Sequence, residues 1–274
     1  MDTLVGRTAV VTGAGSGIGR AMARSLAEAG ANVAVVDIEQ GAAEAVAAEV
    51  AALGVESMAV AVDVADSDAV VALADDVFDR FGDVHVLCNN AGVLILGPEL
   101  DMIVEDWRWI LSVNVLGVAN GVHAFVPRML ERGAPGHIVN TSSVSAFRGN
   151  GPYGASKAAV LSMSETLHDE LVPRGIGVSV VCPGNINSRI LGAQRNRDAS
   201  FGRLAAEPFG TDFTDFGIDA SHVGRRAVEA ILGDELYVFV FPDGWQDDFR
   251  PMVADRFEAI LAAIDRGAVP GTTG

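Results

Sequence analysis

Residues 7–19 read Arg-Thr-Ala-Val-Val-Thr-Gly-Ala-Gly-Ser-Gly-Ile-Gly and decide the fold class. Arg7–Thr12 is a short run rich in β-branched residues, which is typical of a strand. Glycines follow it at once, and a helical pattern then continues to Glu28, where Gly30 stops it. A strand, a glycine-rich turn and a helix in this order predict the first unit of a parallel α/β sheet.

The same alternation continues along the whole chain. The further apolar runs predict strands over Asn32–Val36, Ser57–Val62, Val84–Cys88, Gly136–Thr141, Ile176–Cys182 and Leu236–Phe241. The segments between and after them predict helices over Gln40–Leu53, Ser67–Phe81, Val104–Leu130, Pro152–Leu171 and Gly244–Arg266. We therefore expect a parallel sheet wound by right-handed crossovers, in a single domain over residues 1–274.

Composition limits the classes of function. Half of the residues are apolar, which is enough for a large core, and the net charge of −17 argues against nucleic-acid binding. Cys88 and Cys182 lie in apolar strand-like runs, which indicates buried, reduced thiols. The five histidines show no metal-ligand spacing, so no metal site is predicted.

Two features bear on location. The start of the chain shows no basic segment followed by a long apolar core, so we expect a cytoplasmic protein. The stretch between Arg108 and Arg128 has no charged residue and suggests a membrane span by length alone. It contains Asn114, Asn120 and His123, however, and we therefore predict a helix buried in protein and no membrane contact.

The glycine turn and the second strand predict a nucleotide site. Glycines after a first strand let the backbone approach a pyrophosphate at a helix N-terminus, although a tight structural turn is the alternative for Gly13, Gly17 and Gly19 alone. Asp37 ends the second strand and can accept hydrogen bonds from both adenosine ribose hydroxyls; a helix N-cap is its alternative. A carboxylate would repel a 2′-phosphate, and its neighbour Ile38 supplies no cation, so NAD is predicted over NADP.

A second informative stretch lies at residues 136–159. A strand ends near Ser143, and a helix opens behind Pro152 and places Tyr153 and Lys157 on one face, four residues apart. We expect the Lys157 ammonium to lower the pKa of the phenol from about 10, which suits a proton carrier near neutral pH. Ser143 can direct its hydroxyl at the same point. An ordinary surface pair on a helix is the alternative for Tyr153 and Lys157.

Taken in order, these motifs resemble the short-chain dehydrogenase/reductase family. The resemblance runs from about Val5 to Cys182 and rests on Thr12-Gly-Ala-Gly-Ser-Gly-Ile-Gly19, Asp63-Val64, Asn89-Asn-Ala-Gly92, Asn114, Ser143, Tyr153-x-x-x-Lys157 and Pro183-Gly184. It implies a Rossmann-like, doubly wound parallel sheet with helices on both faces and NAD(P) bound along its C-terminal edge. The span from Ser143 to Tyr153 is ten residues, slightly shorter than in many members.

The resemblance also implies roles for individual residues. Tyr153 is the implied general acid/base, Lys157 binds the nicotinamide ribose, Ser143 polarises the substrate oxygen and Asn114 holds a proton-relaying water. A satisfied buried amide is the alternative for Asn114. The implied cofactor-binding residues are Gly13, Ser16, Gly17, Ile18, Gly19, Asp37, Ile38, Asp63, Val64, Asn90, Ala91, Gly92, Tyr153, Lys157, Pro183, Gly184, Ile186 and Ser188.

The predicted function is NAD-dependent interconversion of a secondary alcohol and a ketone, acting on the CH–OH group. Two alternatives stay open: a reductase of a ketone or oxoacyl substrate, and a dinucleotide-binding scaffold without turnover. The resemblance implies a homotetramer. Independently, the helices Val104–Leu130 and Pro152–Leu171 are apolar around most of their circumference, which indicates a face that meets a partner. Trp107, Trp109 and Trp245 are read as core or interface residues.

The segment 187–219 shows little periodicity and is predicted to be a substrate-binding loop. Its apolar residues favour a bulky, largely apolar secondary alcohol as the substrate; they are Phe201, Leu204, Phe209, Phe213 and Phe216. The run from Asn185 to Gly202 is also similar to family members that oxidise the benzylic alcohol of lignin-type aryl ethers. A common variant of this loop is the alternative, and we favour it.

Overall fold

A computed structural model describes residues 1–95, 97–202 and 217–267 of the chain. It divides into two compact units, Met1–Val240 and Phe241–Gly274. The first unit holds the sheet and the helices α1 to α8, and the second holds the helix α9 (Trp245–Gly267). A single domain over residues 1–274 stays a prediction.

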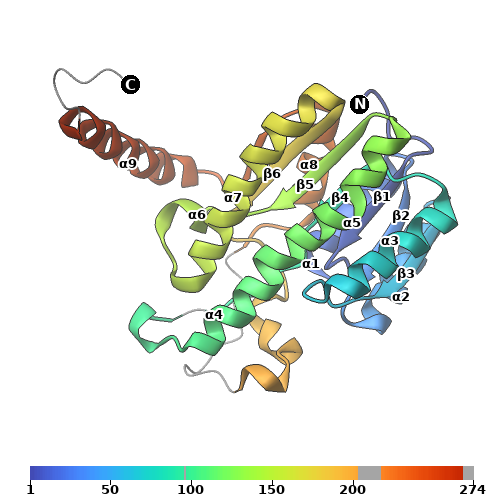
Figure 1. Ribbon diagram of the computed structural model, residues 1–274, viewed down its shortest axis with the longest axis horizontal. Helices are drawn as coiled ribbons and strands as arrows, with labels where there is room; N and C mark the ends of the chain where they lie inside the picture. Colours follow the sequence, from blue (N-terminus) through green and yellow to red (C-terminus); the bar gives the residue numbers. More distant parts are fainter. Residues whose placement is uncertain (96, 203–216, 268–274) are drawn as a thin grey trace. The chain divides into compact units, whose positions relative to one another are not determined.

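The first unit is built on a seven-stranded parallel sheet with the strand order β3-β2-β1-β4-β5-β6-β7 (Figure 1). The strands are β1 (Thr8–Thr12), β2 (Asn32–Asp37), β3 (Ser57–Ala61), β4 (Val86–Asn89), β5 (Gly136–Thr141), β6 (Ile176–Pro183) and β7 (Tyr237–Val240). This arrangement confirms the predicted Rossmann-like α/β fold. The order of the strands reverses between β1 and β4, and in open parallel sheets ligands bind beyond the carboxyl ends of the strands at this point.

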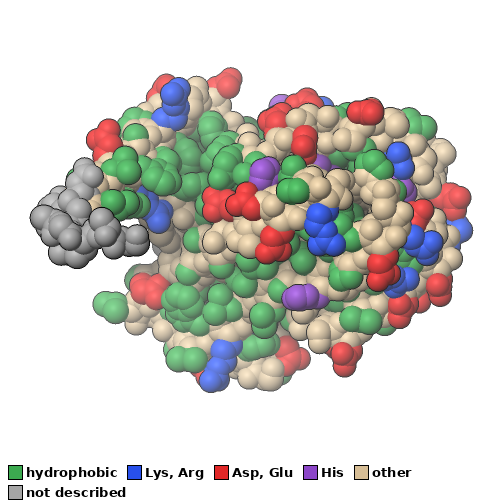
Figure 2. Space-filling model, turned by 45° about the horizontal axis from the view of Figure 1, so that its top comes forward, with side chains coloured by type: hydrophobic (Ala, Val, Ile, Leu, Met, Phe, Trp, Pro, Cys, Tyr) green, Lys and Arg blue, Asp and Glu red, His purple; other side chains and the backbone are tan. Residues whose placement is uncertain are grey.

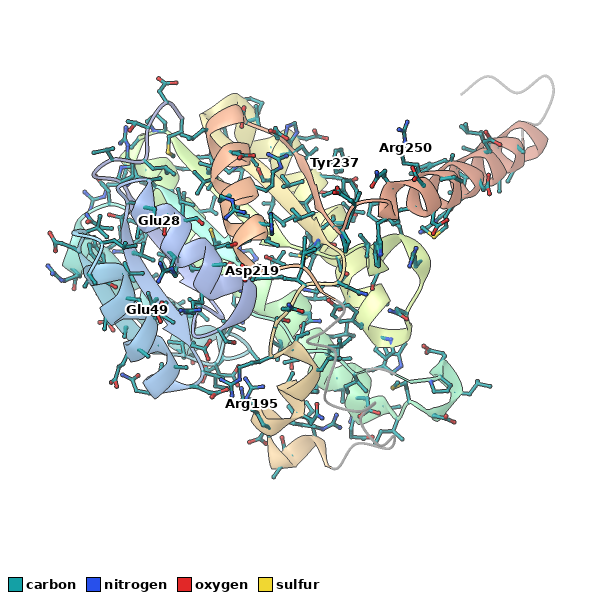
Figure 3. All side chains as sticks on the ribbon, turned by 180° about the vertical axis from the view of Figure 1, so that it is seen from behind. Glu28, Glu49, Arg195, Asp219, Tyr237 and Arg250 are labelled. Atoms are coloured by element: carbon teal, nitrogen blue, oxygen red, sulfur yellow. The ribbon has the colours of Figure 1, made fainter. Side chains whose placement is uncertain are left out.

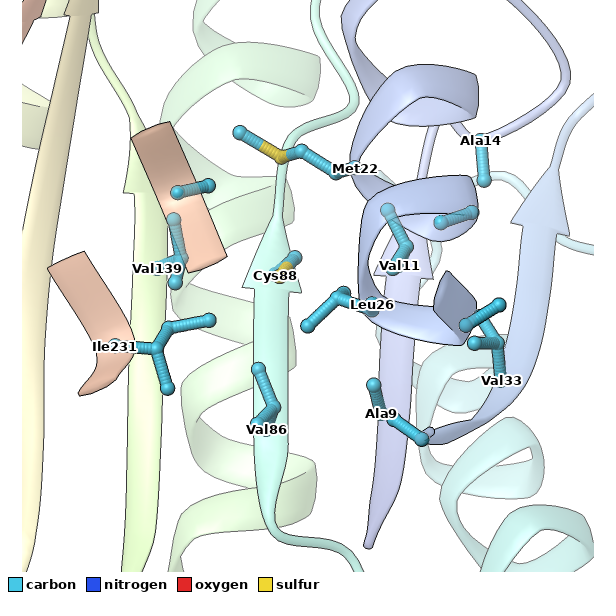
Figure 4. Packing of buried hydrophobic residues seen from close by; sticks show 14 of the residues in the cluster. Ala9, Val11, Ala14, Met22, Leu26, Val33, Val86, Cys88, Val139 and Ile231 are labelled. Carbon is cyan, nitrogen blue, oxygen red and sulfur yellow. The ribbon is translucent and has the colours of Figure 1, made fainter. Parts of the chain in front are cut away.

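Helices cover both faces of the sheet. One face carries α1 (Gly17–Glu28), α2 (Gln40–Ala51) and α8 (Ser221–Gly233), and it is turned to the viewer in Figure 3. The other face carries α3 (Ser67–Phe81), α5 (Gly117–Arg132) and α7 (Gly151–Leu171). On the first face, Met22 and Leu26 of α1 pack with Ile231 of α8 over β-strand residues such as Val11 and Cys88 (Figure 4). Each fully buried side chain of this size contributes about 1.5–3 kcal/mol.

The predicted helix Val104–Leu130 differs from the structure in one respect. It consists of α4 (Val104–Leu111), a π-helical turn (Ser112–Leu116) and α5. The π turn carries Asn114, whose amide bonds to neighbouring segments, and such turns are frequent at functional sites. Sequence periodicity does not reveal a single inserted residue of this kind.

The run Val104–Arg132 is long and apolar enough to cross a membrane by length and composition, with a mean hydropathy of 1.5. In the structure, 44% of its most apolar window is buried inside the protein. Asn120 donates a hydrogen bond to the carbonyl of Val64, so a polar side chain of the run is used to join it to the loop after β3. A buried core helix of a globular protein has these features too.

Candidate active site

A hollow opens at the C-terminal edge of the sheet, where β1, β2, β4, β5 and β6 end. The open space in and in front of it is about 1370 Å³ with its mouth included. All of the predicted cofactor-binding residues line it, and so does Ser143. The hollow also includes residues that are not among the predicted site residues, such as Trp109, Arg189, Arg195 and Asn196.

The glycine turn after β1 is dictated by close packing. Gly13 and Gly17 have φ values of +64° and +51°, which favour glycine. A Cβ on Gly13 would lie 2.8 Å from the Cα of Ala91, and one on Gly19 would overlap the carbonyl oxygen of Gly13. Ser16 caps α1 without a side-chain hydrogen bond to any described residue, so the first backbone N–H groups of the helix face the hollow free of a cap. This cradle fits a pyrophosphate.

A set of hydrogen bonds holds the glycine turn against β4 and β5. The hydroxyl of Thr12 accepts from the backbone N–H groups of Asn90 and Ala91 at 3.0 and 3.1 Å. The Asn90 side chain donates to the Thr12 carbonyl at 3.0 Å and accepts from the Thr141 hydroxyl at 3.2 Å. The side chain of Asn90 therefore positions the turn, while the residue itself lines the hollow. In the sequence, the threonine directly before the first glycine, Thr12, is the residue that could have indicated these hydrogen bonds.

Asp37 lies at the opposite end of the hollow from the tyrosine helix. Its Oδ2 accepts from the backbone of Gly15 at 2.8 Å, and its Oδ1 accepts from the backbone of Glu39 at 3.0 Å. A carboxylate oxygen can accept more than one hydrogen bond, so both oxygens keep capacity for a ribose diol. These bonds fix the direction of the carboxylate. Asp63 and Val64 line the neighbouring wall, after β3.

The residues that follow Asp37 in the sequence supply no cation, but the fold brings cations from a distant segment to this end of the hollow. Arg195 and Arg189 come from the segment after β6, and both approach Glu39, two residues beyond Asp37. Their positions in the sequence, more than 150 residues away, gave no sign of this contact. Arg20, in contrast, is bonded to Glu49 and does not line the hollow.

Tyr153, Ser143 and Lys157 converge at the inner end of the hollow, and each is at most 9% exposed. The phenol is hydrogen-bonded with Ser143. The Lys157 ammonium donates to the carbonyl of Thr141 at 2.8 Å and lies 5.7 Å from the centre of the Tyr153 ring. Ser142 is turned the other way and donates to the carbonyl of Lys157 at 2.7 Å. Of the two serines, Ser143 is therefore the one that meets the phenol.

Burial controls the pKa values of this cluster. It raises the pKa of Tyr153 to about 12, against the opposing effect of the hydrogen bond with Ser143. It also lowers the pKa of Lys157 to about 8, so the ammonium is still largely charged near pH 7. The expectation that Lys157 brings the phenol pKa below 10 is wrong for the chain by itself. Desolvation of the phenol outweighs the hydrogen bond with Ser143, and the Lys157 ammonium is bonded to the carbonyl of Thr141.

Asn114 is fully buried behind this cluster. Its Oδ1 accepts from the backbone of Val93 at 2.8 Å, and its Nδ2 donates to the Val93 carbonyl and to Ser156, both at 3.0 Å. The structure thus matches the buried-amide alternative for the side chain. A Cβ on Gly92 would lie 3.3 Å from Asn114 Oδ1 and 3.4 Å from Lys157 Nζ, so both flank Gly92.

An apolar wall completes the hollow beside the tyrosine. Trp109 and Ile110 of α4 form a buried cluster with Val93, Ile95 and Ala193, and Phe201 packs against it. Trp109 was expected in the core, and it also lines the hollow, because helical periodicity does not separate a core from a pocket wall. The predicted anchors Leu204, Phe209, Phe213 and Phe216, and part of the predicted loop 187–219, lie outside the described residues.

A buried ion pair holds the segment after β6 in place. Arg197 contacts Asp106 of α4 at 2.7 Å, and their side chains are only 4% and 1% exposed. The same guanidinium donates to the carbonyl of Phe201 at 2.6 Å and lies 5.2 Å from the centre of the Trp109 ring. Arg197 therefore positions two aromatic residues of the wall.

Comparisons with known proteins agree with this geometry. The family model described as short chain dehydrogenase matches residues 7–199. The chain is 37% identical over 260 residues to the 1-deoxy-11-beta-hydroxypentalenate dehydrogenase of Streptomyces exfoliatus, covering 93% of this chain and 88% of that one. It is 34% identical over 268 residues to the C alpha-dehydrogenase of Sphingobium sp. strain SYK-6, covering 94% and 86%. A solved structure of a short chain dehydrogenase/reductase from Burkholderia phymatum in complex with NAD superposes with a TM-score of 0.84 at 33% identity, covering 100% and 99% of the two chains.

Proposed function

The chain belongs to the short-chain dehydrogenase/reductase family, and from this premise we propose that it is an NAD-dependent dehydrogenase that interconverts a bulky, apolar secondary alcohol and its ketone. Members of this family are oxidoreductases that use a nicotinamide dinucleotide and act on a small-molecule substrate. One observation carries the proposal. Tyr153, Ser143 and Lys157 meet at the inner end of the hollow whose outer end presents Asp37.

The cofactor would lie between these two ends. The backbone N–H groups after Gly13 and at the start of α1 would hold its pyrophosphate, and Asp37 its adenosine ribose. Pro183–Ser188 would flank the nicotinamide. When bound, the cofactor supplies the acceptor for the hydride that leaves the carbinol carbon. The steric cradle around the glycines supports this fit.

The chain's own residues would handle the proton. Tyr153, as phenolate, would accept the hydroxyl proton of the alcohol, and Ser143 would hold the same oxygen by a hydrogen bond. Lys157 would counteract the effect of burial, which raises the pKa of Tyr153 to about 12 in the chain by itself, because its ammonium is charged near pH 7 and lies 5.7 Å from the ring centre. In the reverse direction the same phenol would protonate the ketone oxygen.

The apolar wall of the hollow beside Tyr153 supports the proposed substrate class. Trp109, Val113, Ala193 and Phe201 offer an apolar surface to a substrate carbon skeleton. The two named relatives are dehydrogenases whose names denote a hydroxypentalenate and a Cα position. Both names are compatible with a hydroxyl on a bulky skeleton, and this supports the proposal for the present chain.

The test is an alcohol panel assayed by NADH formation. We expect alicyclic and aryl secondary alcohols to give a kcat/KM at least about tenfold above that of small aliphatic ones, since each extra buried methylene contributes about 0.8 kcal/mol. Higher efficiency with small aliphatic alcohols would contradict the substrate class. Binding of NADH without turnover of any alcohol or ketone would favour a scaffold.

We also place the enzyme in the cytosol, which the free, buried Cys88 and Cys182 support.

A further inference from the structure

The carboxylate of Glu39 is surrounded by donors from the segment after β6. Its Oε1 accepts from Arg195 Nε at 2.7 Å and from Asn196 Nδ2 at 3.1 Å. Arg195 Nη2 contacts the same oxygen at 2.7 Å, and Arg189 Nη2 lies 3.7 Å from Oε2. Two guanidinium groups and one amide thus face a single carboxylate.

This arrangement is an anion site that is already filled from within the chain. The Nε and Nη2 of an arginine form the fork that binds carboxylates and phosphates with two parallel hydrogen bonds. In Arg195 that fork is directed at Glu39, while Nη1 donates to the carbonyls of Arg189 and Gly192 and fixes the guanidinium. Arg195 is therefore preorganised to hold an anion at this point.

The site lies at the adenosine end of the hollow. Arg189, Arg195 and Asn196 line the hollow together with Asp37 and Ile38. The backbone N–H of Glu39 donates to Asp37 Oδ1 at 3.0 Å, which fixes the two acidic residues beside each other. An anion attached to the ribose that Asp37 is proposed to bind would therefore meet these three donors.

We propose that Glu39 selects the cofactor by occupying this anion site, so that the 2′-phosphate of NADP finds its cationic partners already neutralised. Asp37 then repels the phosphate directly, and Glu39 withholds the arginines that would otherwise compensate. This inference rests on the proposed function, because it assigns the adenosine ribose to Asp37. The selection is a property of two acidic residues and not of Asp37 alone.

The ion pairs themselves are too exposed to be needed for folding. The side chains of Glu39, Arg195 and Arg189 are 30%, 34% and 53% exposed, and pairs of this kind contribute about 0–1 kcal/mol each. The hydrogen bond from Asn196 and the charges of Arg195 and Arg189 hold the pKa of the Glu39 carboxyl below its usual value. The carboxylate therefore stays charged at neutral pH, and its removal leaves two cations facing the hollow.

The test is Glu39→Ala, with Glu49→Ala as the matched control. Glu49 lies on α2, the helix that Glu39 caps, and it also neutralises two arginines, Arg20 and Arg24 of α1. These two arginines do not line the hollow. Figure 3 labels Glu49 and Arg195, which lie apart on α2 and on the segment after β6. The readout is the dissociation constant of NADH and of NADPH by fluorescence titration, which needs no substrate.

In Glu39→Ala we expect the ratio of NADPH to NADH affinity to rise at least about tenfold, and in Glu49→Ala to stay unchanged. Adding Arg195→Ala to Glu39→Ala should remove most of the gain. An unchanged ratio in Glu39→Ala, with NADH still bound, would overturn the inference and leave the proposed function standing. A wild-type chain that binds neither nucleotide would overturn the proposed function, and this inference with it.

Discussion

Asp37 and Glu39 stand two residues apart at the end of β2 and use their carboxylates differently. Asp37 is held by the backbone of Gly15 and Glu39 itself, so its free acceptor capacity is directed into the hollow. Glu39 is turned to Arg195 and Asn196. The same chemical group, a carboxylate, thus serves in our proposal to bind a ribose at Asp37 and to neutralise cations at Glu39.

The first prediction concerns Asp37→Ser. We expect NADH affinity to fall by about ten- to a hundredfold, because one or two charge-assisted hydrogen bonds to the ribose are lost. NADPH affinity should rise at the same time, since the repulsion is gone. Fluorescence titration measures both, and Glu49→Ala serves as the control for an acidic residue removed from the same region. Unchanged affinity for NADH would show that the carboxylate does not bind the ribose.

A second prediction concerns His137, a buried residue of β5 far from the proposed chemistry. The Ser179 hydroxyl donates to the carbonyl of Glu235 at 2.6 Å, so His137 Nε2, at 2.8 Å from that hydroxyl, carries a proton and donates to it. Burial lowers the pKa of His137 to about 4, against the opposing effect of Asp234 at 3.8 Å. The folded chain therefore keeps this imidazole neutral.

The sign of the effect on stability follows from that pKa. Between about pH 6.5 and pH 4 the unfolded chain binds the proton and the folded chain does not, so stability is lost as the pH falls through this window, by up to about 3 kcal/mol. Urea unfolding at pH 7 and pH 5 measures this loss, and His137→Asn should reduce it. Equal stability of the wild type at both pH values, or an undiminished loss in His137→Asn, would contradict the assignment.

At the scale of elements, the segment after β6 is where sequence and structure diverge most. The apolar runs of the strands and the helix α3 were readable from the sequence, because periodicity and glycine stops are local properties. The π turn at Asn114 and the pairs Arg195–Glu39 and Arg197–Asp106 were not, because they depend on contacts between distant residues. The residues that line the cofactor side of the hollow were predicted through the resemblance to a family. The pKa of Tyr153 was not, since burial is known only from the fold.

The third prediction addresses this segment. Arg197→Met leaves Asp106 buried without its cation and removes the hydrogen bond to the carbonyl of Phe201. We therefore expect KM for a bulky alcohol to rise at least about tenfold, and KM for the cofactor to change less. The cost in stability is about 3–5 kcal/mol. The double variant Arg197→Met with Asp106→Leu should recover stability but not KM. Arg128→Met is the control: it breaks an ion pair of the same length, 2.7 Å, with the largely exposed Asp75, and should change neither the KM for the alcohol nor, by much, the stability. A wild-type KM in the double variant would contradict a positioning role.

At the scale of the whole molecule, charge is spread over the surface. The net charge is −17, and on the face drawn in Figure 2 the basic side chains are scattered among the acidic ones. Such a surface supports solubility and offers little to a phosphate backbone. The helical run of α4 and α5 presents exposed apolar residues instead, with Val104 60% and Leu116 53% exposed.

The fourth prediction is that the chain forms a homotetramer with two-fold axes. The exposed apolar residues of this run would be covered by a second copy, since large apolar side chains are otherwise costly to leave in water. Sedimentation at micromolar concentration should give the mass of four chains. Leu116→Glu should shift that mass downward without loss of the fold, whereas Leu53→Glu, also exposed but in the turn after α2, should not. A wild-type mass of one chain would refute the prediction.

The central claim is that Tyr153 moves the proton in an alcohol–ketone conversion, and Tyr153→Phe tests it most directly. The variant keeps the ring in its buried place and deletes the group bonded with Ser143. The measurement is kcat for NADH formation with the best secondary alcohol of the panel, beside the affinity for NADH. The account predicts a loss of about 100- to 10,000-fold in kcat with NADH affinity nearly unchanged. Retention of more than about a tenth of the wild-type kcat would contradict it.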